Sequence, residues 1–439
     1  AEDGIRDVER SRGLGDVYKR QIKRKLMKIV NPNKHNLSKE KLQFMDELFM
    51  DRYISTGKIS GTQTLVARNG EIVHCHSQGL RDIEQNLKME DDSIFRIYSM
   101  TKPVTGVALM QLYEKGYFHL ADPVSKFLPE FKNQSVYISG IYPAFDTRPV
   151  NREMTIRDLL THTSGLSYSI NFENHLDSAY RHVFDELLPD RERRSLDLKE
   201  VCETLATLPL QFSPGEGWLY SVSIDVCARI VEVISGEKID DYFKENIFDP
   251  LGMKDTGFIV PKKDADRLTA LYWRTPEKKL VLEDPSGNES NMLIDKNYKG
   301  GGSGLASTIE DYFKFSQMLL NGGELNGKRI LSRKTVELMT MNHLPDNKTL
   351  LDMNAGGGFS EVRYQGMGYG LSMAVTVDQA ATQISGTAGS YNWGGMASTF
   401  FWIDPKENLL GIFMTQLRPS TTFPFRGQMQ AMVYGAFED

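Results

Sequence analysis

The sequence predicts an α/β fold of the α+β kind, in which an antiparallel sheet is flanked by helices and carries an inserted helical lobe. The first observation is that strand-like runs rich in β-branched and aromatic residues occur near both ends of the chain. The second is that helical patterns fill the middle, which suggests one sheet built from both ends. These changes between strand-like and helical patterns divide the chain into three parts. They are a first part of the sheet domain at 27–98, a mainly helical lobe at 99–310 and the rest of the sheet domain at 311–439.

Local signals predict each element in order. A helix at 37–53 is followed by strands at 62–67 and 71–77, and the Asn69-Gly70 pair between the strands is a strong hairpin signal. Helical spacing and end signals predict the next helices, at 99–114, 155–162, 198–208, 223–235, 239–248 and 308–320. The C-terminal part then predicts strands at 371–377, 396–403 and 409–415, and a closing helix at 426–437.

The first 26 residues differ from the rest because they have no apolar periodicity. Six of the ten residues at 19–28 are basic, and the stretch has no sustained apolar region of the kind found in secretory signals. We expect a non-native or disordered leader ahead of a reading frame that begins near Met27, and a basic arm that binds a partner is the alternative. Without a signal or an apolar run of membrane-spanning length, the sequence predicts a cytoplasmic protein of bacterial origin.

Length and composition are those of a globular protein with a sizeable core. The chain has 439 residues, of which 40% are hydrophobic, and its net charge is −6. That charge argues against nucleic acid or an anionic membrane as a partner. The three cysteines lie far apart in the sequence, so we expect no disulfide framework. His74 and His76 share one face of a predicted strand without a third candidate ligand nearby, so we expect no metal.

Ser99 and Lys102 are the candidate chemical centre of the chain. They stand three residues apart at the head of the helix predicted at 99–114, and residues with that spacing share a helix face. A serine hydroxyl is a weak nucleophile until a neighbouring base removes its proton. Lysine is such a base only when it is neutral, and burial together with the positive end of a helix lowers its pKa. One turn of one element therefore supplies both nucleophile and base.

Three other patterns compete with this pair and have simpler explanations. Ser38 and Lys41 repeat the spacing, but Ser38 is a good N-cap for the amphipathic helix that follows. His162 is the candidate base of a Ser-His-Asp arrangement, and a packed histidine at a helix end is the favoured interpretation because Lys102 already supplies a base. The glycine-rich run at 300–304 lacks the Gly-Lys-Ser/Thr ending of a phosphate-binding loop, so it predicts a turn that leads into the next helix.

Two distant stretches add groups that a Ser99 site needs. Tyr220 follows a turn at the mouth of a helix, where its phenol can share or relay the serine proton. Trp393, Gly394 and Gly395 open a predicted strand, where a substrate can approach the backbone closely. A backbone N–H there, together with that of Ser99, would form an oxyanion hole.

Taken together, these stretches resemble the family VIII carboxylesterases, which have the fold of class C β-lactamases and penicillin-binding proteins. The motifs that carry the resemblance are those at 95–102, 159–166, 220–223, 247–256 and 393–395. It spans roughly residues 38 to 437. The resemblance implies Ser99 as the acylated nucleophile and Lys102 with Tyr220 as the proton-transfer pair. It also implies the Met396 amide as the second oxyanion donor and residues 393–395 as substrate-binding. The expected ligand is a small-molecule ester, with no cofactor or metal, and a homo-oligomer is left open.

The sequence departs from the β-lactamase version of this pattern at two places. Val222 stands where Tyr-x-Asn would have its asparagine, and the chain contains no Lys-Thr-Gly. Since a β-lactam carboxylate favours a cationic contact, an apolar wall at Trp393 is better suited to an uncharged ester. A β-lactamase or D-Ala-D-Ala peptidase and a non-catalytic penicillin-binding-like protein are the alternatives. An α/β-hydrolase is disfavoured because Gly-x-Ser-x-Gly does not occur.

Overall fold

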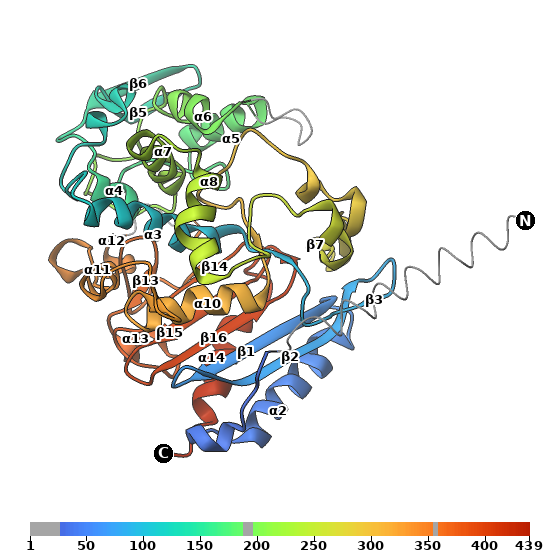
Figure 1. Ribbon diagram of the computed structural model, residues 1–439. Helices are drawn as coiled ribbons and strands as arrows, with labels where there is room; N and C mark the ends of the chain where they lie inside the picture. The colour runs from blue at the N-terminus through green and yellow to red at the C-terminus, as the bar shows by residue number, and fades with distance from the viewer. Residues whose placement is uncertain (1–26, 188–195, 354–358) are drawn as a thin grey trace, which may run out of the picture.

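The computed structural model of the chain describes residues 27–187, 196–353 and 359–439 (Figure 1). The expected leader at 1–26 therefore lies outside the described residues. In Figure 1 the sheet fills the lower part of the molecule and the helical lobe lies above it, with the helix that follows Ser99 between the two.

The sheet has eight strands in the order β12-β13-β14-β15-β16-β1-β2-β3, and every neighbouring pair is antiparallel. The strands are β1 (Gly61–Arg68), β2 (Glu71–Asp82), β3 (Leu87–Lys88), β12 (Met367–Tyr369), β13 (Ala374–Thr376), β14 (Tyr391–Gly394), β15 (Phe400–Asp404) and β16 (Leu409–Met414). Strands β1 and β16 are paired, with Leu65 opposite Ile412. The two ends of the chain thus meet inside one sheet, which confirms the predicted architecture.

The hairpin predicted between the first two strands is confirmed. Asn69 and Gly70 have positive φ values of 54° and 79°. A two-residue turn that follows the twist of its strands requires this backbone at both positions, and asparagine and glycine adopt it at the least cost.

The strand predicted at 396–403 is wrong, because it joins a turn to a strand. Strand β14 ends at Gly394 instead of beginning there, and β15 begins only at Phe400. The turn between them is closed by a hydrogen bond from the Gly395 N–H to the Thr399 carbonyl, 2.9 Å. Sequence alone shows that two glycines allow close approach, but it does not show on which side of them the strand lies.

Helices cover both faces of the sheet: α2 (Lys39–Phe49) and α14 (Phe425–Gly435) on one face, and α10 (Ile309–Leu320) on the other (Figure 1). On the first face the rings of Phe49, Phe413 and Phe425 pack together with centroids 5.2 to 6.3 Å apart. On the second, the ring of Tyr312 lies 5.1 Å from that of Phe401. The sheet is therefore buried on both sides, as its largely apolar strands require.

The lobe is built from α3 (Thr101–Glu114), α4 (Ile156–Leu160), α5 (His175–Leu187), α6 (Leu198–Leu205), α7 (Ser223–Ser235) and α8 (Ile239–Phe243). Helix α3 is buried at every position from Thr101 to Met110, because it packs against α7 on one side and faces the sheet on the other. The helix predicted at 155–162 is α4, and Thr155 and Asp158 form a capping box at its start. A helix that is buried all round is a rigid support for the residues at its start.

The structure also contains elements that the sequence pattern did not predict. Besides β3, β12 and α5, whose bounds are given above, they are β4 (Phe95–Arg96), β5 (Ser135–Ile141), β6 (Ala144–Pro149), β7 (Leu271–Arg274), β8 (Leu280–Asp284), β9 (Ala306–Ser307), β10 (Glu324–Leu325), β11 (Lys328–Arg329), β17 (Leu417–Arg418), α9 (Asp249–Leu251), α11 (Arg333–Met339), α12 (Leu350–Met353) and α13 (Gln379–Thr382). In the hairpin of β5 and β6, Ile138 and Ile141 are 58% and 61% exposed. The alternation that marks a half-buried strand is therefore missing there.

The sequence predicts neither a disulfide framework, nor a membrane-spanning segment, nor a metal site, and each expectation can be compared with the described residues. All three cysteines carry free thiols. Within the described ranges, none of the helices is long and apolar enough to cross a membrane. In the same ranges no group of three or more His, Cys, Asp or Glu side chains is placed to hold a metal ion. His74 pairs with Asp46 instead, Nε2 to Oδ2 3.1 Å.

Candidate active site

Ser99 lies in a short 3₁₀ turn, Tyr98–Met100, that leads directly into α3. Its side chain is buried, with the residue 4% exposed. The preceding Tyr98 has φ 43°, in the left-handed region that non-glycine residues rarely adopt. Backbone strain of this kind collects at functional sites, where the surrounding structure must hold it.

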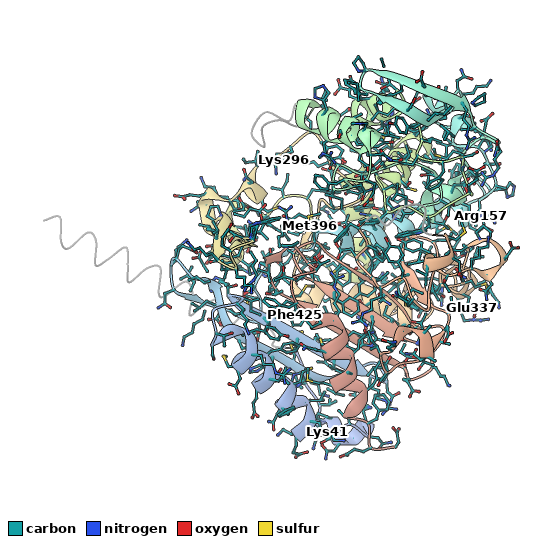
Figure 2. All side chains as sticks on the ribbon, turned by 180° about the vertical axis from the view of Figure 1, so that it is seen from behind. Lys41, Arg157, Lys296, Glu337, Met396 and Phe425 are labelled. Atoms are coloured by element: carbon teal, nitrogen blue, oxygen red, sulfur yellow. The ribbon has the colours of Figure 1, made fainter. Side chains whose placement is uncertain are left out.

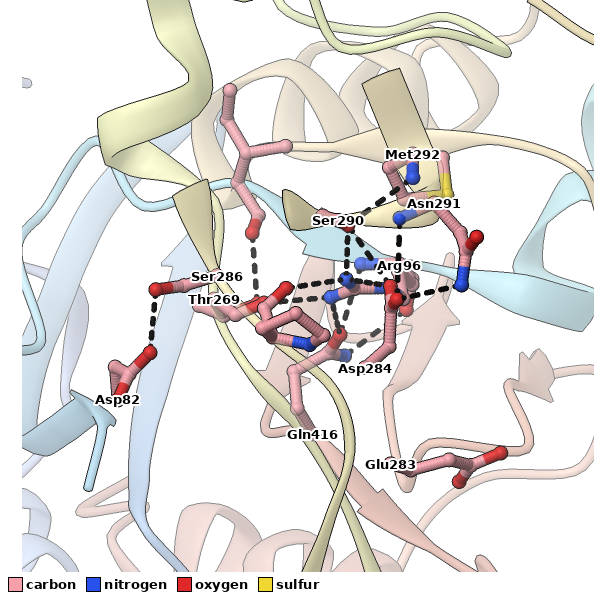
Figure 3. Close-up of polar contacts among 12 residues, drawn as sticks. Asp82, Arg96, Thr269, Glu283, Asp284, Ser286, Ser290, Asn291, Met292 and Gln416 are labelled. Carbon is pink, nitrogen blue, oxygen red and sulfur yellow. Dashed lines mark hydrogen bonds and ion pairs between the residues drawn. The ribbon is translucent and has the colours of Figure 1, made fainter. Parts of the chain in front are cut away.

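A buried polar cluster around Arg96 holds the segment that enters this turn (Figure 3). The Arg96 guanidinium pairs with Asp284 and donates to the Thr269 carbonyl at 2.6 Å and the Ser290 hydroxyl at 2.7 Å. The side-chain amide of Gln416 accepts from the Arg96 N–H and donates to the Arg96 carbonyl, both at 3.1 Å. Backbone and side chain of residue 96 are thus fixed, three residues before Ser99.

Ser99, Lys102 and Tyr220 meet as the sequence predicted. The Tyr220 hydroxyl donates to Ser99 Oγ at 2.6 Å, and Lys102 Nζ lies 3.3 Å from the same oxygen. Lys102 Nζ also donates to the Gly302 carbonyl at 2.7 Å and lies 4.6 Å from the centre of the Tyr220 ring. Lys102 and Tyr220 are both buried, at 0% and 1% exposure. One hydroxyl therefore faces two buried proton-carrying groups.

Burial moves the pKa values of these two groups in opposite directions. It lowers the pKa of Lys102 from 10.5 to about 8, against the smaller opposing effect of the negative charges on Asp225 and Glu361. Burial raises the pKa of Tyr220 well above its usual 10. A neutral amine is therefore accessible near neutral pH, whereas the phenol keeps its proton. This division favours Lys102 as the base and Tyr220 as a proton donor.

The glycine-rich run at 300–304 takes part in the site, which sequence reasoning missed. Gly302 supplies the carbonyl that holds Lys102, and its own N–H donates to buried Asp225 at 3.1 Å. A Cβ on Gly301 would lie 2.4 Å from the Cβ of Ala228, and one on Gly302 would lie 2.5 Å from Asp225 Oδ2. Three consecutive glycines were the available signal of such close backbone approach.

His162 does not form a triad with Ser99. Its Nδ1 lies 3.0 Å from the Ser221 hydroxyl, and its ring packs 5.0 Å from that of Tyr220. The residue is fully buried, which lowers the pKa of the imidazole well below its usual 6.5. A neutral imidazole in this position supports the Tyr220 ring, in agreement with the packed helix-end interpretation.

The end of β14 lies against the turn Tyr98–Met100 that carries Ser99. A Cβ on Gly395 would lie 2.3 Å from the Ile97 carbonyl oxygen, so only glycine fits there. Trp393 is fully buried, with its ring 5.4 Å from that of Tyr220 and 5.3 Å from that of Tyr369. In this structure Trp393 therefore supports Tyr220, and its predicted contact with substrate stays a prediction.

Met396 follows these glycines at the junction of the lobe and the sheet, as Figure 2 shows. The residue is partly exposed, and within the described residues its amide N–H has no acceptor. The Ser99 amide lies in the first turn of a helical segment, where N–H groups have no intrahelical partner. Both amides are thus suited to bind a developing oxyanion, and that role stays a prediction.

Comparison with known proteins adds four relationships. Residues 43–433 match the family model described as Beta-lactamase. The chain is 34% identical over 366 residues to Protein Rv1367c of Mycobacterium tuberculosis, covering 83% of this chain and 87% of that protein. It is 29% identical over 406 residues to Esterase EstB of Burkholderia gladioli, covering 88% and 93%. The solved structure of "EstCE1, a hydrolase with promiscuous acyltransferase activity" has a TM-score of 0.74 at 24% identity, covering 90% and 98%, which shows a shared fold.

Proposed function

Because the chain belongs to the beta-lactamase family, we propose that it is a serine carboxylesterase that hydrolyses short- to medium-chain esters through an acyl-enzyme on Ser99. One observation carries the proposal: Ser99 Oγ lies within hydrogen-bond distance of two buried groups, Lys102 at 3.3 Å and Tyr220 at 2.6 Å. Similarity to an esterase over 88% of the chain supports an ester as the substrate. The ligand we propose is a small uncharged ester.

In the proposed acylation step, neutral Lys102 accepts the Ser99 proton while Ser99 Oγ bonds to the ester carbonyl carbon. The amine keeps N–H groups for the Gly302 carbonyl, so its lone pair is free to face the serine. The amides of Ser99 and Met396 stabilise the oxyanion of the tetrahedral intermediate. This assignment follows from the opposite pKa changes of the lysine and the tyrosine.

Collapse of the intermediate breaks the bond to the alcohol oxygen, which takes the proton of Tyr220 and leaves as the free alcohol. The proton held by Lys102 then restores the phenol, since the two groups lie close together. Water attacks the acyl-enzyme in the second half of the reaction. It loses a proton to Lys102, and Ser99 regains its own as the acid departs, so the enzyme is unchanged.

The charges near the site support an uncharged substrate. A β-lactam presents a carboxylate, for which a cation is the best partner. Position 393 is tryptophan, and the cation that stands beside Gly394, Arg426, is paired with Glu361 at 2.5 Å. A β-lactamase or peptidase on the same machinery is the alternative, and a direct substrate comparison distinguishes the two.

The kcat/KM for an uncharged ester is expected to rise about tenfold per pH unit below pH about 8 and to level off above it, because Lys102 must lose a proton to act as base. The measurement is a pH profile of kcat/KM. The Asp225→Asn variant is the control. It removes a negative charge that raises the lysine pKa, so the rising part of its pH profile should move to lower pH. A profile of the parent that rises with an apparent pKa near 6.5, and that does not shift in the variant, would contradict lysine as the base.

Short and medium acyl esters are expected to be hydrolysed well and a chromogenic cephalosporin poorly. Loss of one charge-assisted contact of about 1.5–3 kcal/mol corresponds to about tenfold to a hundredfold in relative kcat/KM. A panel of esters and the cephalosporin, assayed side by side with the same enzyme, measures the ratio. A parent that turns over the cephalosporin as fast as its best ester would overturn the esterase proposal.

A double variant tests the reason for this preference. Trp393→Lys with Val222→Asn introduces a cation and an amide at the two positions where the sequence departs from the lactamase pattern. Relative to the parent enzyme, it should hydrolyse the ester more slowly and the cephalosporin faster. Trp393→Met is the matched control, because it removes the buried ring without adding charge, and melting curves establish that each variant is folded.

A further inference from the structure

An ion pair lies directly behind the end of β14. Arg426, in the first turn of α14, donates from Nη2 to Glu361 Oε2 at 2.5 Å and to the Gly395 carbonyl at 3.2 Å. It also donates to the Thr399 carbonyl at 3.3 Å and to the backbone carbonyl of Glu361. Ser420 donates to the same carboxylate oxygen at 3.1 Å. The arginine thus links both ends of the turn at 395–399 to the Glu361 carboxylate.

The Glu361 side chain is fully buried, at 0% exposure, and the Arg426 side chain is 19% exposed. Within the described residues, Glu361 Oε1 has no hydrogen-bond partner. Burying a carboxylate is costly, and a buried ion pair contributes little net stability over a well-packed apolar pair. Its clearest effect here is geometric, because it fixes the direction of a guanidinium that contacts the backbone carbonyls of Gly395 and Thr399 as well as that of Glu361.

Fixing the Gly395 carbonyl also fixes the N–H of the next residue. The Gly395 carbonyl and the Met396 N–H belong to one planar trans peptide group, so they point in opposite directions. Arg426 holds the carbonyl on its own side. Gly395 packs closely against Ile97, two residues before Ser99. The Met396 N–H is consequently held on the side of the peptide group away from the arginine.

We infer that Arg426 and Glu361 are positioning residues for the oxyanion hole, in which the guanidinium aims the Met396 amide and the carboxylate holds the guanidinium. The inference rests on the proposed function. It assigns a role in the reaction to residues that touch neither the substrate nor the reacting atoms. It also gives a reason why a cation beside the site is paired instead of free.

The test compares variants by their turnover per titrated active site. Arg426→Met combined with Glu361→Gln removes the donor without leaving a buried, unpaired carboxylate. We expect kcat to fall about a hundredfold with KM little changed. Removing an oxyanion donor itself lowers kcat by about 10²–10³-fold, so the loss expected here lies at the lower end of that range. Affinity for an aryl boronic acid, which forms a tetrahedral adduct on serine, should fall by a similar factor. Arg426→Lys retains one donor and should recover part of both losses.

The matched control is Arg68→Gln. Arg68 is similarly buried, with its side chain 9% exposed, and pairs with Asp439 at 3.0 Å. It stands opposite Leu409, at the other end of the sheet from Gly394. This variant should lower the melting temperature without changing kcat per titrated site or boronate affinity.

These measurements distinguish failure of the proposed function from failure of the positioning role. A parent that shows no ester turnover and no boronate adduct contradicts the proposed function. An active parent whose Arg426 variants keep full kcat per titrated site and full boronate affinity contradicts the positioning role alone. So does a loss equal to that of Arg68→Gln, since a purely structural effect would give the same result. If the double variant fails to fold, Arg426→Lys and Glu361→Gln decide by the same two measurements.

Discussion

Replacing Ser99 by alanine is expected to abolish ester turnover, with a loss of about 10⁵-fold or more in kcat, because no other group can form the acyl-enzyme. The protein should keep its fold, since the change removes one small hydroxyl from a buried turn. Turnover of a chromogenic ester, followed at high enzyme concentration, measures the loss. Labelling with a fluorophosphonate should modify the parent and leave the variant untouched.

Ser38→Ala is the matched control, because Ser38 begins the second Ser-x-x-Lys of the chain. Its hydroxyl caps α2 by accepting from the Lys41 N–H at 3.4 Å. Losing that cap is expected to cost about 1 kcal/mol of stability and to leave activity almost intact. Mass spectrometry that finds the acyl group on Ser38, or on any serine other than Ser99, would overturn the assignment. A parent that no fluorophosphonate labels would favour a non-catalytic protein.

Lys102→Ala and Tyr220→Phe are each expected to lower kcat by about 10³-fold or more, and the double variant should lose little beyond the worse single one. The reason is that both groups belong to one proton relay at Ser99: Lys102 takes the serine proton, and Tyr220 protonates the leaving alcohol and regains its proton from Lys102. The first deletion therefore already interrupts the relay. The measurement is a double-mutant cycle on kcat with melting curves for each variant. Losses that multiply in the double variant would mean that the two residues act independently.

His162→Ala separates this pair from a histidine triad. The imidazole contacts the Tyr220 ring and not Ser99, so the expected loss of kcat is moderate, and the cavity left by the imidazole should lower the stability. A loss as deep as that of Lys102→Ala in a protein that melts normally would instead favour histidine as the base.

Local chemistry explains which parts of the fold were predictable. The turn at Asn69-Gly70 requires positive φ at both positions, and the cap at Thr155 and Asp158 is specified within four residues. The contact between Ser99 and Lys102 is likewise a matter of helical spacing. Such features depend on neighbours in the sequence, so a single chain displays them without knowledge of the rest of the fold.

The remaining parts of the site depend on contacts between distant segments. Arg426 and Glu361 are 65 residues apart, and Lys102 and Gly302 are 200 apart. Nothing local distinguishes this arginine or this glutamate from surface residues. The glycines at 301, 302 and 395 gave the only sequence signal, because they show that another backbone or side chain comes close without showing which one.

The pairing of β1 with β16 also has a consequence for the order of assembly. Thr415 donates to the Gly61 carbonyl, and these residues are 354 apart in the chain. On the ribosome the first hairpin is complete early, yet one edge of β1 stays unpaired until nearly the whole polypeptide has been made. The unpaired backbone N–H and C=O groups of such a strand edge can pair with a strand of another chain. A C-terminal truncation before β16 would therefore leave that edge of β1 without its partner strand.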